Sequence, residues 1–163
     1  DDHVTISETV RSSNVDITED FRRAEKERLK LMVRSFASNA VRGTNCSILD
    51  LKLGTMTPGQ YSIDRDLNTL SLRPSSGDGT ATLLEISKIC DVFREKELRG
   101  RRDITNVEGL SQIASEERKK LVVIQIHAGA EMQLHGILEG DRDARDNFVT
   151  CMNILRLYAE VNK

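Results

Sequence analysis

Histidine and cysteine are the side chains in this sequence that could bind a metal ion or act as a nucleophile. The chain has three of each, which are His3, His127, His135, Cys46, Cys90 and Cys151. They form no CxxC pair, no HxxxH or HExxH, and no other spacing that zinc sites use. An odd number of widely spaced cysteines argues against a disulfide scaffold and suits a reducing compartment. We therefore expect no metal site and mostly buried, inert cysteines.

Motifs for catalysis are also missing from the sequence. It contains no GxSxG, no P-loop and no GxGxxG, and the loop Gly77-Asp78-Gly79 lacks the following elements that phosphate binding requires. Asp141 and Asp143 stand just before a helical pattern, so we expect them to cap a helix rather than to act as an acid and base. These observations predict a protein that is not an enzyme and uses no cofactor.

Basic residues could instead bind an anionic partner. The chain has 24 lysines and arginines against 26 acidic residues, and this net charge of −2 argues against nucleic acid as the main partner. A local cluster of cations consists of Arg94, Lys96, Arg99, Arg101 and Arg102. Because Glu95, Glu97 and Asp103 lie among them, our first interpretation is a solvated face with intramolecular ion pairs. The alternative is contact with an acidic partner or with anionic lipid.

Two stretches have the spacing of amphipathic helices. The first covers residues 18–41 and follows a lead, residues 1–17, that lacks periodicity and that we expect to be flexible. We expect this helix to pack on its own domain, and the alternative is a membrane-surface or partner helix. The second stretch is residues 140–163, which places Ala144, Phe148, Met152, Leu155 and Ala159 on one side.

Between the helices the apolar period changes from 3.6 to 2, which indicates short strands. We expect strands at 46–53, near 61–63, at 70–74, over 83–93 as one bent or two short strands, at 121–127 and at 132–138. Thr57-Pro58-Gly59-Gln60 predicts a type II turn, because Pro and Gly occupy its second and third positions. Residues 94–120 are irregular apart from a hint of a short helix, and long excursions of this kind often carry function.

Seven short strands followed by one amphipathic helix resemble a pleckstrin-homology (PH) domain over about residues 43–162. The resemblance is sharpest in the spaced isoleucines and valine of residues 84–92 and in residues 143–149, which look like the start of the family's closing helix. The family usually has tryptophan where Phe148 stands, and this chain has none. The resemblance implies a mainly β fold with α, in which a bent seven-stranded antiparallel sandwich or barrel at 43–163 is capped by a C-terminal helix. The helix at 18–41 is extra.

In size, in its free cysteines and in the charged helix before the barrel, the chain also resembles the inner membrane complex sub-compartment proteins of apicomplexan parasites. The sequence begins at Asp1 rather than at methionine, and the resemblance implies myristoyl and palmitoyl groups upstream of Asp1. It further implies a peripheral position on the cytoplasmic side of the inner membrane complex. The expected role is a scaffold for protein partners of the membrane–cytoskeleton layer during daughter-cell formation.

Lipid-binding PH domains place a lysine near the end of the first strand and two basic residues at alternate positions in the second. Lys52 could fill the first place, but no lysine or arginine lies between Leu53 and Asp64. Hydrogen bonds to charged groups contribute about 1.5–3 kcal/mol each, so losing two or more could remove most of the roughly 8 kcal/mol behind micromolar affinity. We therefore expect no working phosphoinositide pocket. The alternative is binding of phosphoinositide or anionic lipid through Lys52, Arg94, Arg99, Arg101 and Arg102.

Overall fold

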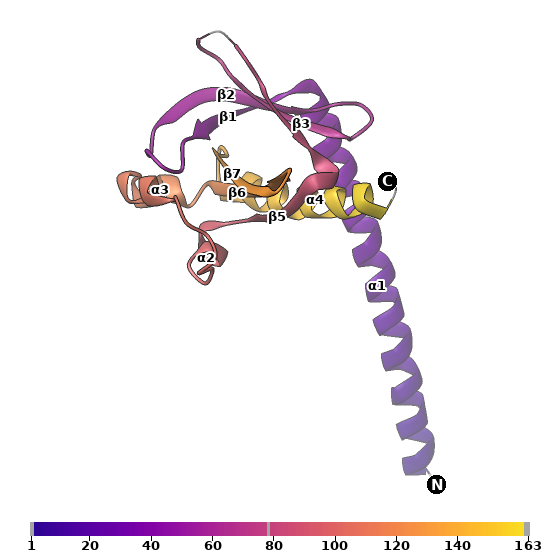
Figure 1. The fold of residues 1–163 in the computed structure, drawn as a ribbon. Coiled ribbons are helices and arrows are strands. Elements are labelled where there is room, and N and C mark those ends of the chain that lie inside the picture. Colours follow the sequence, from indigo (N-terminus) through magenta and orange to yellow (C-terminus); the bar gives the residue numbers. More distant parts are fainter. Residues whose placement is uncertain (1, 78, 162–163) are drawn as a thin grey trace. The chain divides into compact units, whose positions relative to one another are not determined.

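The computed structural model describes residues 2–77 and 79–161, with side chains from residue 18 onward (Figure 1). Asp78 of the predicted glycine loop lies outside the described residues. The chain divides into two compact units, Asp1–Arg34 and Ser35–Lys163. Helix α1 (Asp2–Arg42) runs through the first unit, and its last turns belong to the second.

Helix α1 begins at Asp2, whereas the sequence predicts a helix that begins at Thr18. Because the side chains of residues 1–17 lie outside the description, the predicted lead at 1–17 stays a prediction. Ion pairs between side chains three residues apart run along the exposed part of the helix, namely Arg23–Asp20, Arg28–Glu25 and Lys30–Glu27. Pairs at this spacing stabilise a solvated helix modestly.

Gly43 ends helix α1. It has a φ of +98°, and its N–H donates to the Ala40 carbonyl at 3.1 Å. A left-handed residue after the last turn is a common helix terminator, and glycine adopts that conformation without strain. The chain can therefore turn directly from α1 into the first strand.

Seven strands form one antiparallel sheet in the order β4-β3-β2-β1-β7-β6-β5. Their bounds are β1 (Thr44–Leu49), β2 (Met56–Ile63), β3 (Thr69–Pro74), β4 (Thr82–Glu85), β5 (Ile89–Phe93), β6 (Leu121–Ala128) and β7 (Glu131–Leu138). Figure 1 shows β1–β3 as one layer and β5–β7 as the other. Within the described residues β4 does not pair with β5, so the sheet is bent but not closed. The predicted fold class is confirmed.

The turn predicted at residues 57–60 is wrong, because these residues belong to β2. Pro58 pairs with Ser47 of β1, and Gly59 pairs with Cys46. Gly59 is buried where the strands approach closely, since a Cβ there would lie 2.6 Å from the Arg73 carbonyl oxygen. The glycine therefore serves strand packing, and the chain reverses earlier, over residues 50–55. The first strand accordingly ends at Leu49 and not at residue 53.

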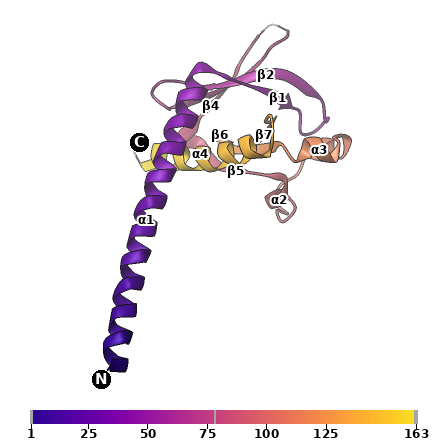
Figure 2. The same ribbon diagram turned by 180° about the vertical axis from the view of Figure 1, so that it is seen from behind.

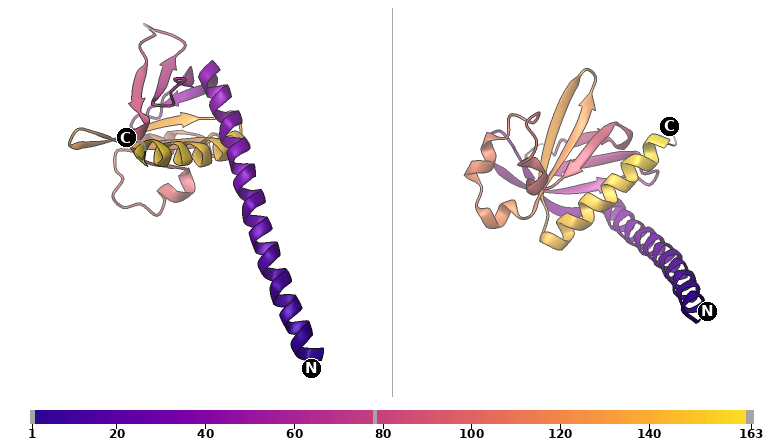
Figure 3. Two further views of the ribbon diagram at one scale, coloured as in Figure 1. Left: turned by 90° about the vertical axis from the view of Figure 1, so that its right-hand side faces the viewer. Right: turned by 90° about the horizontal axis from the view of Figure 1, so that it is seen from below.

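The remaining segments follow the predicted order with some added detail. Residues 83–93 form two short strands separated by the 3₁₀ turn η1 (Ile86–Lys88). The irregular region 94–120 contains α2 (Glu95–Leu98), the 3₁₀ turn η2 (Glu108–Gln112) and α3 (Ser115–Arg118). The β6–β7 hairpin projects beyond the neighbouring strands (Figure 3).

Helix α4 (Arg142–Val161) closes the sheet and lies against β5, β6 and η1 (Figure 2). Asp141 caps it, because its side chain accepts a hydrogen bond from the Ala144 N–H at 2.7 Å. The buried stripe contains Phe148, Cys151, Met152 and Leu155. Phe148 is fully buried and meets the rings of Phe36 and Tyr61 edge-on, at 5.6 and 5.0 Å between centroids. Phenylalanine thus fills the hydrophobic place that tryptophan usually holds.

Candidate functional site

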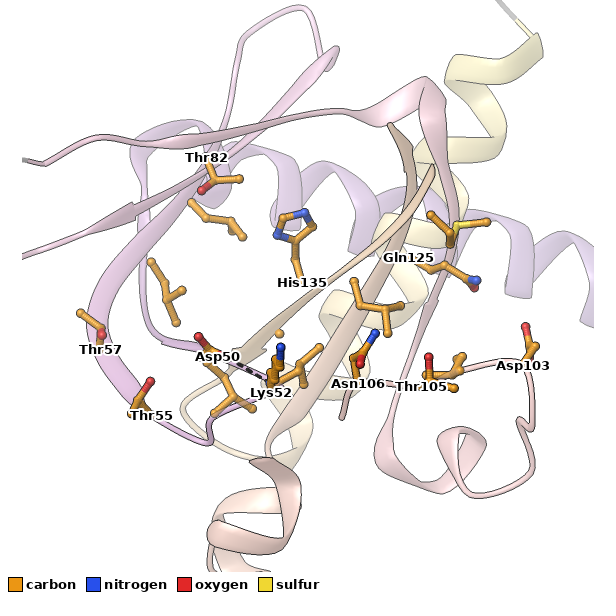
Figure 4. A pocket seen from close by; sticks show the side chains of 18 residues that line it. Asp50, Lys52, Thr55, Thr57, Thr82, Asp103, Thr105, Asn106, Gln125 and His135 are labelled. Atoms are coloured by element: carbon orange, nitrogen blue, oxygen red, sulfur yellow. Dashed lines mark hydrogen bonds between the residues drawn. The ribbon is translucent and has the colours of Figure 1, made fainter. Parts of the chain in front are cut away.

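A cavity of about 650 Å³ lies at the end of the sheet where β1 turns into β2, and we call it the mouth pocket. Its walls come from the 50–55 turn, from the start of β4, from residues 103–106 and from β7. Figure 4 labels its polar lining, which consists of Asp50, Lys52, Thr55, Thr57, Thr82, Asp103, Thr105, Asn106, Gln125 and His135. Lys52, the residue considered in the sequence as a headgroup contact, belongs to this lining.

The β1–β2 turn places Lys52 at the rim of the mouth pocket. The Asp50 carboxylate accepts hydrogen bonds from the backbone N–H groups of Lys52 and Leu53, each at 2.9 Å. The Gly54 N–H donates to the Asp50 carbonyl at 2.7 Å, and Gly54 has a φ of +83°. The Lys52 side chain is exposed, and its ammonium forms no ion pair among the described residues. The backbone of the turn thus holds Lys52, while its charge remains accessible.

The irregular region is fastened to the same turn through Gly109. The Gly109 N–H donates to the Leu51 carbonyl at 2.8 Å. A Cβ on Gly109 would overlap the Gly54 nitrogen, and a Cβ on Gly54 would lie 2.5 Å from the Gly109 oxygen. Only glycine at both positions allows this backbone contact. Leu98 and Ile113 of the same region are buried in a cluster with Leu51. Residues 103–106 therefore form a fixed wall of the pocket.

The described lining of the mouth pocket contains Lys52 as its one lysine or arginine and two carboxylates, Asp50 and Asp103. Burial lowers the pKa of His135, so this imidazole is neutral at pH 7. Strand β2 carries no lysine or arginine. A headgroup with several phosphates would meet one ammonium beside the Asp50 carboxylate, and an Asp103 carboxylate whose charge is balanced by Arg101. Neutral hydroxyl or amide groups would find many partners in the same lining.

Arg101, one of the predicted contact residues, binds neighbouring side chains. Its guanidinium donates to both carboxylate oxygens of Asp103, at 2.8 and 2.7 Å, and to Asp91 at 3.2 Å. It also donates to Gln125 at 3.3 Å and lies 5.6 Å from the centroid of the Phe93 ring. Arg101 holds the pKa of Asp103 down at about 2. These contacts attach the start of the irregular region to β5 and β6.

Arg94 and Arg99 are also engaged inside the molecule. Arg94 pairs with Glu97 at 2.6 Å and with Asp146 of α4 at 3.1 Å. Arg99 pairs with Glu95 at 3.0 Å. Such exposed or half-exposed pairs contribute at most about 1 kcal/mol each, but they orient the guanidinium groups toward acidic neighbours rather than toward a common ligand.

Arg102 and Lys96 complete the cluster, and both are exposed without an ion pair among the described residues. The structure does not bring the residues predicted to contact a partner or lipid into one pocket; these are Lys52, Arg94, Arg99, Arg101 and Arg102. Lys52 lines the mouth pocket, and none of Arg94, Arg99, Arg101 and Arg102 is part of that lining.

Sequence reasoning missed the residues that the irregular region contributes to the mouth pocket, above all Asp103 and Asn106. Asn106 has a φ of +64°, a conformation that asparagine tolerates better than most residues. That preference indicates a tight bend. Nothing in the local pattern places the bend beside the 50–55 turn, because the contact joins segments far apart in the sequence.

Nucleophilic or metal chemistry finds little support in the described residues. Burial raises the pKa of Cys46 to about 12 and that of Cys151 to about 11, so both thiols stay protonated at neutral pH. No group of three His, Cys, Asp or Glu side chains in the described ranges could hold a metal ion. None of the described helices is long and apolar enough to cross a membrane.

No protein-family model and no curated protein matches this sequence. Among solved structures, the fold is similar to Inner Membrane Complex Sub-compartment Protein 1 from Toxoplasma gondii, with a TM-score of 0.57 and 12% identity over 78% of this chain and 92% of that one. The PH domain from TgAPH has a TM-score of 0.52 and 9% identity, over 82% and 94% of the two chains. S. officinalis PLC21 has a TM-score of 0.53 and 8% identity over 73% of this chain.

The chain spans only 16% of the length of that PLC21 protein, whereas it spans nearly all of the other two structures. At these identities the similarity concerns the fold alone. The fold is PH-like and resembles that of the inner membrane complex sub-compartment proteins.

Proposed function

Starting from this PH-like fold, we propose that the chain is a non-catalytic interaction module without a working phosphoinositide pocket. The charge of the mouth pocket carries the proposal. Lys52 is the single lysine or arginine of the described lining, the Asp50 carboxylate lies beside it, and β2 has no lysine or arginine. Each charged hydrogen bond that a phosphate would lack is worth about 1.5–3 kcal/mol. A headgroup should then bind far more weakly than with micromolar affinity.

We further propose that the protein belongs to the inner membrane complex of a parasite cell, on its cytoplasmic side. The fold similarity to Inner Membrane Complex Sub-compartment Protein 1 supports this assignment. In the proposal, myristoyl and palmitoyl groups upstream of Asp1 attach the protein to the membrane, because one acyl chain alone gives only marginal binding. The module then contributes to daughter-cell formation by holding protein partners of the membrane–cytoskeleton layer.

The partner surface in this proposal is the exposed side of residues 18–34 or the outer face of region 94–120. Phe21 and Leu31 are 67% and 63% exposed, which is high for large apolar side chains. Arg102 and Lys96 offer unpaired charge on the second surface. A pull-down with Phe21→Glu and Leu31→Glu combined should lose partners that the wild type retains. If this variant and an Arg102→Glu, Lys96→Glu variant both keep every partner, the scaffold proposal is wrong.

Calorimetric titration tests the state of the mouth pocket directly. Inositol phosphates carrying three or four phosphates should show no saturable binding in the micromolar range. Micromolar binding that Lys52→Ala abolishes would refute the proposal. Lys88→Ala is a suitable control, because Lys88 is an exposed lysine outside the mouth pocket lining.

The alternative is that the module binds anionic lipid through its surface charge. It is favoured by the accessible, unpaired side chains of Lys52 and Arg102. Flotation with phosphatidylserine vesicles separates the two proposals, using the chain without acyl groups. Flotation of the chain with the vesicles that Arg102→Glu removes and that Arg99→Glu leaves largely intact would favour the lipid alternative, because Arg99 is already paired with Glu95.

A further inference from the structure

A second hollow of about 430 Å³ lies within the unit Ser35–Lys163, and we call it the side pocket. It is bordered by the last two turns of α1, the beginning of β1 and the beginning of α4. Its lining includes Phe36, Arg42, Asn45, Tyr61, Glu139 and Asn147. None of the residues predicted to contact a partner or lipid takes part in it.

Glu139 is the unusual group in the side pocket, because it is a carboxylate with only 5% of its surface exposed. One carboxylate oxygen accepts a hydrogen bond from the Tyr61 hydroxyl at 2.7 Å, and the Gly140 N–H also donates to the group. Within the described residues, no lysine, arginine or histidine lies within ion-pair distance of it. Buried carboxylates are normally paired with a cation, since an unpaired buried charge is costly.

The surroundings hold Glu139 in place. Tyr61 is 3% exposed, and its ring contacts those of Phe36 and Phe148, at 6.3 and 5.0 Å between centroids. Tyr61 cannot swing out to water without disturbing this aromatic cluster, and its hydroxyl holds the Glu139 carboxylate. The carboxylate therefore remains at the pocket wall whether or not a cation neutralises it.

We propose that the side pocket binds the ammonium group of a lysine side chain from a protein partner, with Glu139 as its counter-ion. This inference rests on the proposed role as a protein-interaction module. A lysine ammonium is compact, is carried on a flexible stem and needs only one acceptor, which suits a carboxylate that is buried and already accepts a hydrogen bond from Tyr61. The amide oxygens of Asn45 and Asn147 already accept hydrogen bonds from Gln60 and Cys151, so Glu139 is the main acceptor for the ammonium. Phe36 also lines the pocket and offers apolar surface to the aliphatic stem.

The other charged or titratable groups around Glu139 come from every element packed against it. Arg42 of α1 lines the rim, Cys46 lies on β1, and Asp141 precedes α4. Lys120, whose carbonyl accepts the Glu139 N–H, pairs its own ammonium with Glu117. Arg42 is the cation that repels an incoming lysine, so Arg42→Gln should strengthen binding. A bound metal ion does not fit this pocket, because such ions need several oxygen ligands with negative charge, and Glu139 is the single carboxylate of the described lining.

The test titrates the whole chain with Nα-acetyl-lysine-methylamide while NMR follows the side-chain carboxyl carbon of Glu139. Burial raises the pKa of Glu139 to about 7, and the probe should bind the ionised form, so it should bind about tenfold more tightly at pH 8 than at pH 6. The same molecule acetylated at Nε is neutral and should not bind. Glu139→Gln should abolish binding, and Glu160→Gln, which alters an exposed glutamate, should not.

Several results would overturn the inference. One is equal binding of the charged and neutral probes, and another is no response of Glu139 to the charged probe. A Glu139 titration below pH 4.5 in the free protein would mean that a resident cation already fills the site. Binding of n-butylammonium without binding of the lysine probe would point to free amines rather than a partner's lysine. Because these experiments use no inositol phosphate, headgroup binding at the mouth pocket would refute only the proposed function.

Discussion

Replacing Gly109 by alanine should detach the irregular region from the β1–β2 turn. The new Cβ would overlap the Gly54 nitrogen and would lie 2.7 Å from the Leu51 carbonyl oxygen. Both obstacles are backbone atoms, which cannot rotate aside as a side chain could. The backbones must separate, and the hydrogen bond from the Gly109 N–H to the Leu51 carbonyl, now 2.8 Å, must lengthen or break.

The expected cost is about 2–4 kcal/mol of unfolding free energy. Forcing an extra methyl group into a packed contact typically costs about 1–3 kcal/mol, and the lost hydrogen bond adds about 1 kcal/mol. For a chain of this size, that range corresponds to a fall in melting temperature of roughly 5–15 °C. The Asp103–Asn106 wall of the mouth pocket should become mobile before the sheet unfolds, because the contact of Gly109 with the turn helps to hold it.

Urea unfolding followed by circular dichroism measures the stability, and amide hydrogen exchange over residues 103–112 measures the local release. Gly100→Ala is the matched control, because the nearest atom to its Cβ would be the Glu97 oxygen at 3.8 Å, an ordinary contact. That variant should be as stable as the wild type or slightly more stable. If Gly109→Ala unfolds at the same urea concentration as Gly100→Ala, the close backbone contact does not exist and the reasoning fails.

Further expectations concern pH, the core and the ion pairs. Burial raises the pKa of Glu139 in the folded protein from 4.5 to about 7, so protonation of this group stabilises the fold. This contribution to the free energy of unfolding is fully present below pH 4.5, and roughly 3 kcal/mol is lost as the pH rises through 7. Urea unfolding at pH 4.5 and 8 should show this loss in the wild type and in Glu160→Gln, but not in Glu139→Gln. Phe148→Ala should lower the free energy of unfolding by about 3–5 kcal/mol in the same assay, and a loss under 1 kcal/mol would contradict the assigned core. Arg101→Gln should lower the urea midpoint more than Arg102→Gln, because only Arg101 bonds to β5 and β6; equal midpoints would argue against that anchor.

Much of the candidate site could not be predicted from the sequence, although its components could. Lys52 was expected near the end of the first strand, and it lines the mouth pocket. The arginines at 94–102 were expected as one cluster, but their carboxylate partners divide them among α2, β5 and α4. The choice among these partners depends on which acidic side chains the fold brings near. Sequence spacing reveals only the partners within one turn, such as Glu97 and Glu95.

The sequence by itself determined the class of fold. The strand-forming run of β6, the capping residue Asp141 and the apolar stripe through Phe148 depend on neighbours a few residues away, and each appears in the structure where it was expected. The tertiary structure alone decided that Pro58 and Gly59 continue a strand and that Gly54 meets Gly109. It also decided that Glu139 is buried without an ion pair to any side chain that the structure describes. The physical reason is that close approach and desolvation are set by residues distant in the sequence, whereas periodicity and capping are local.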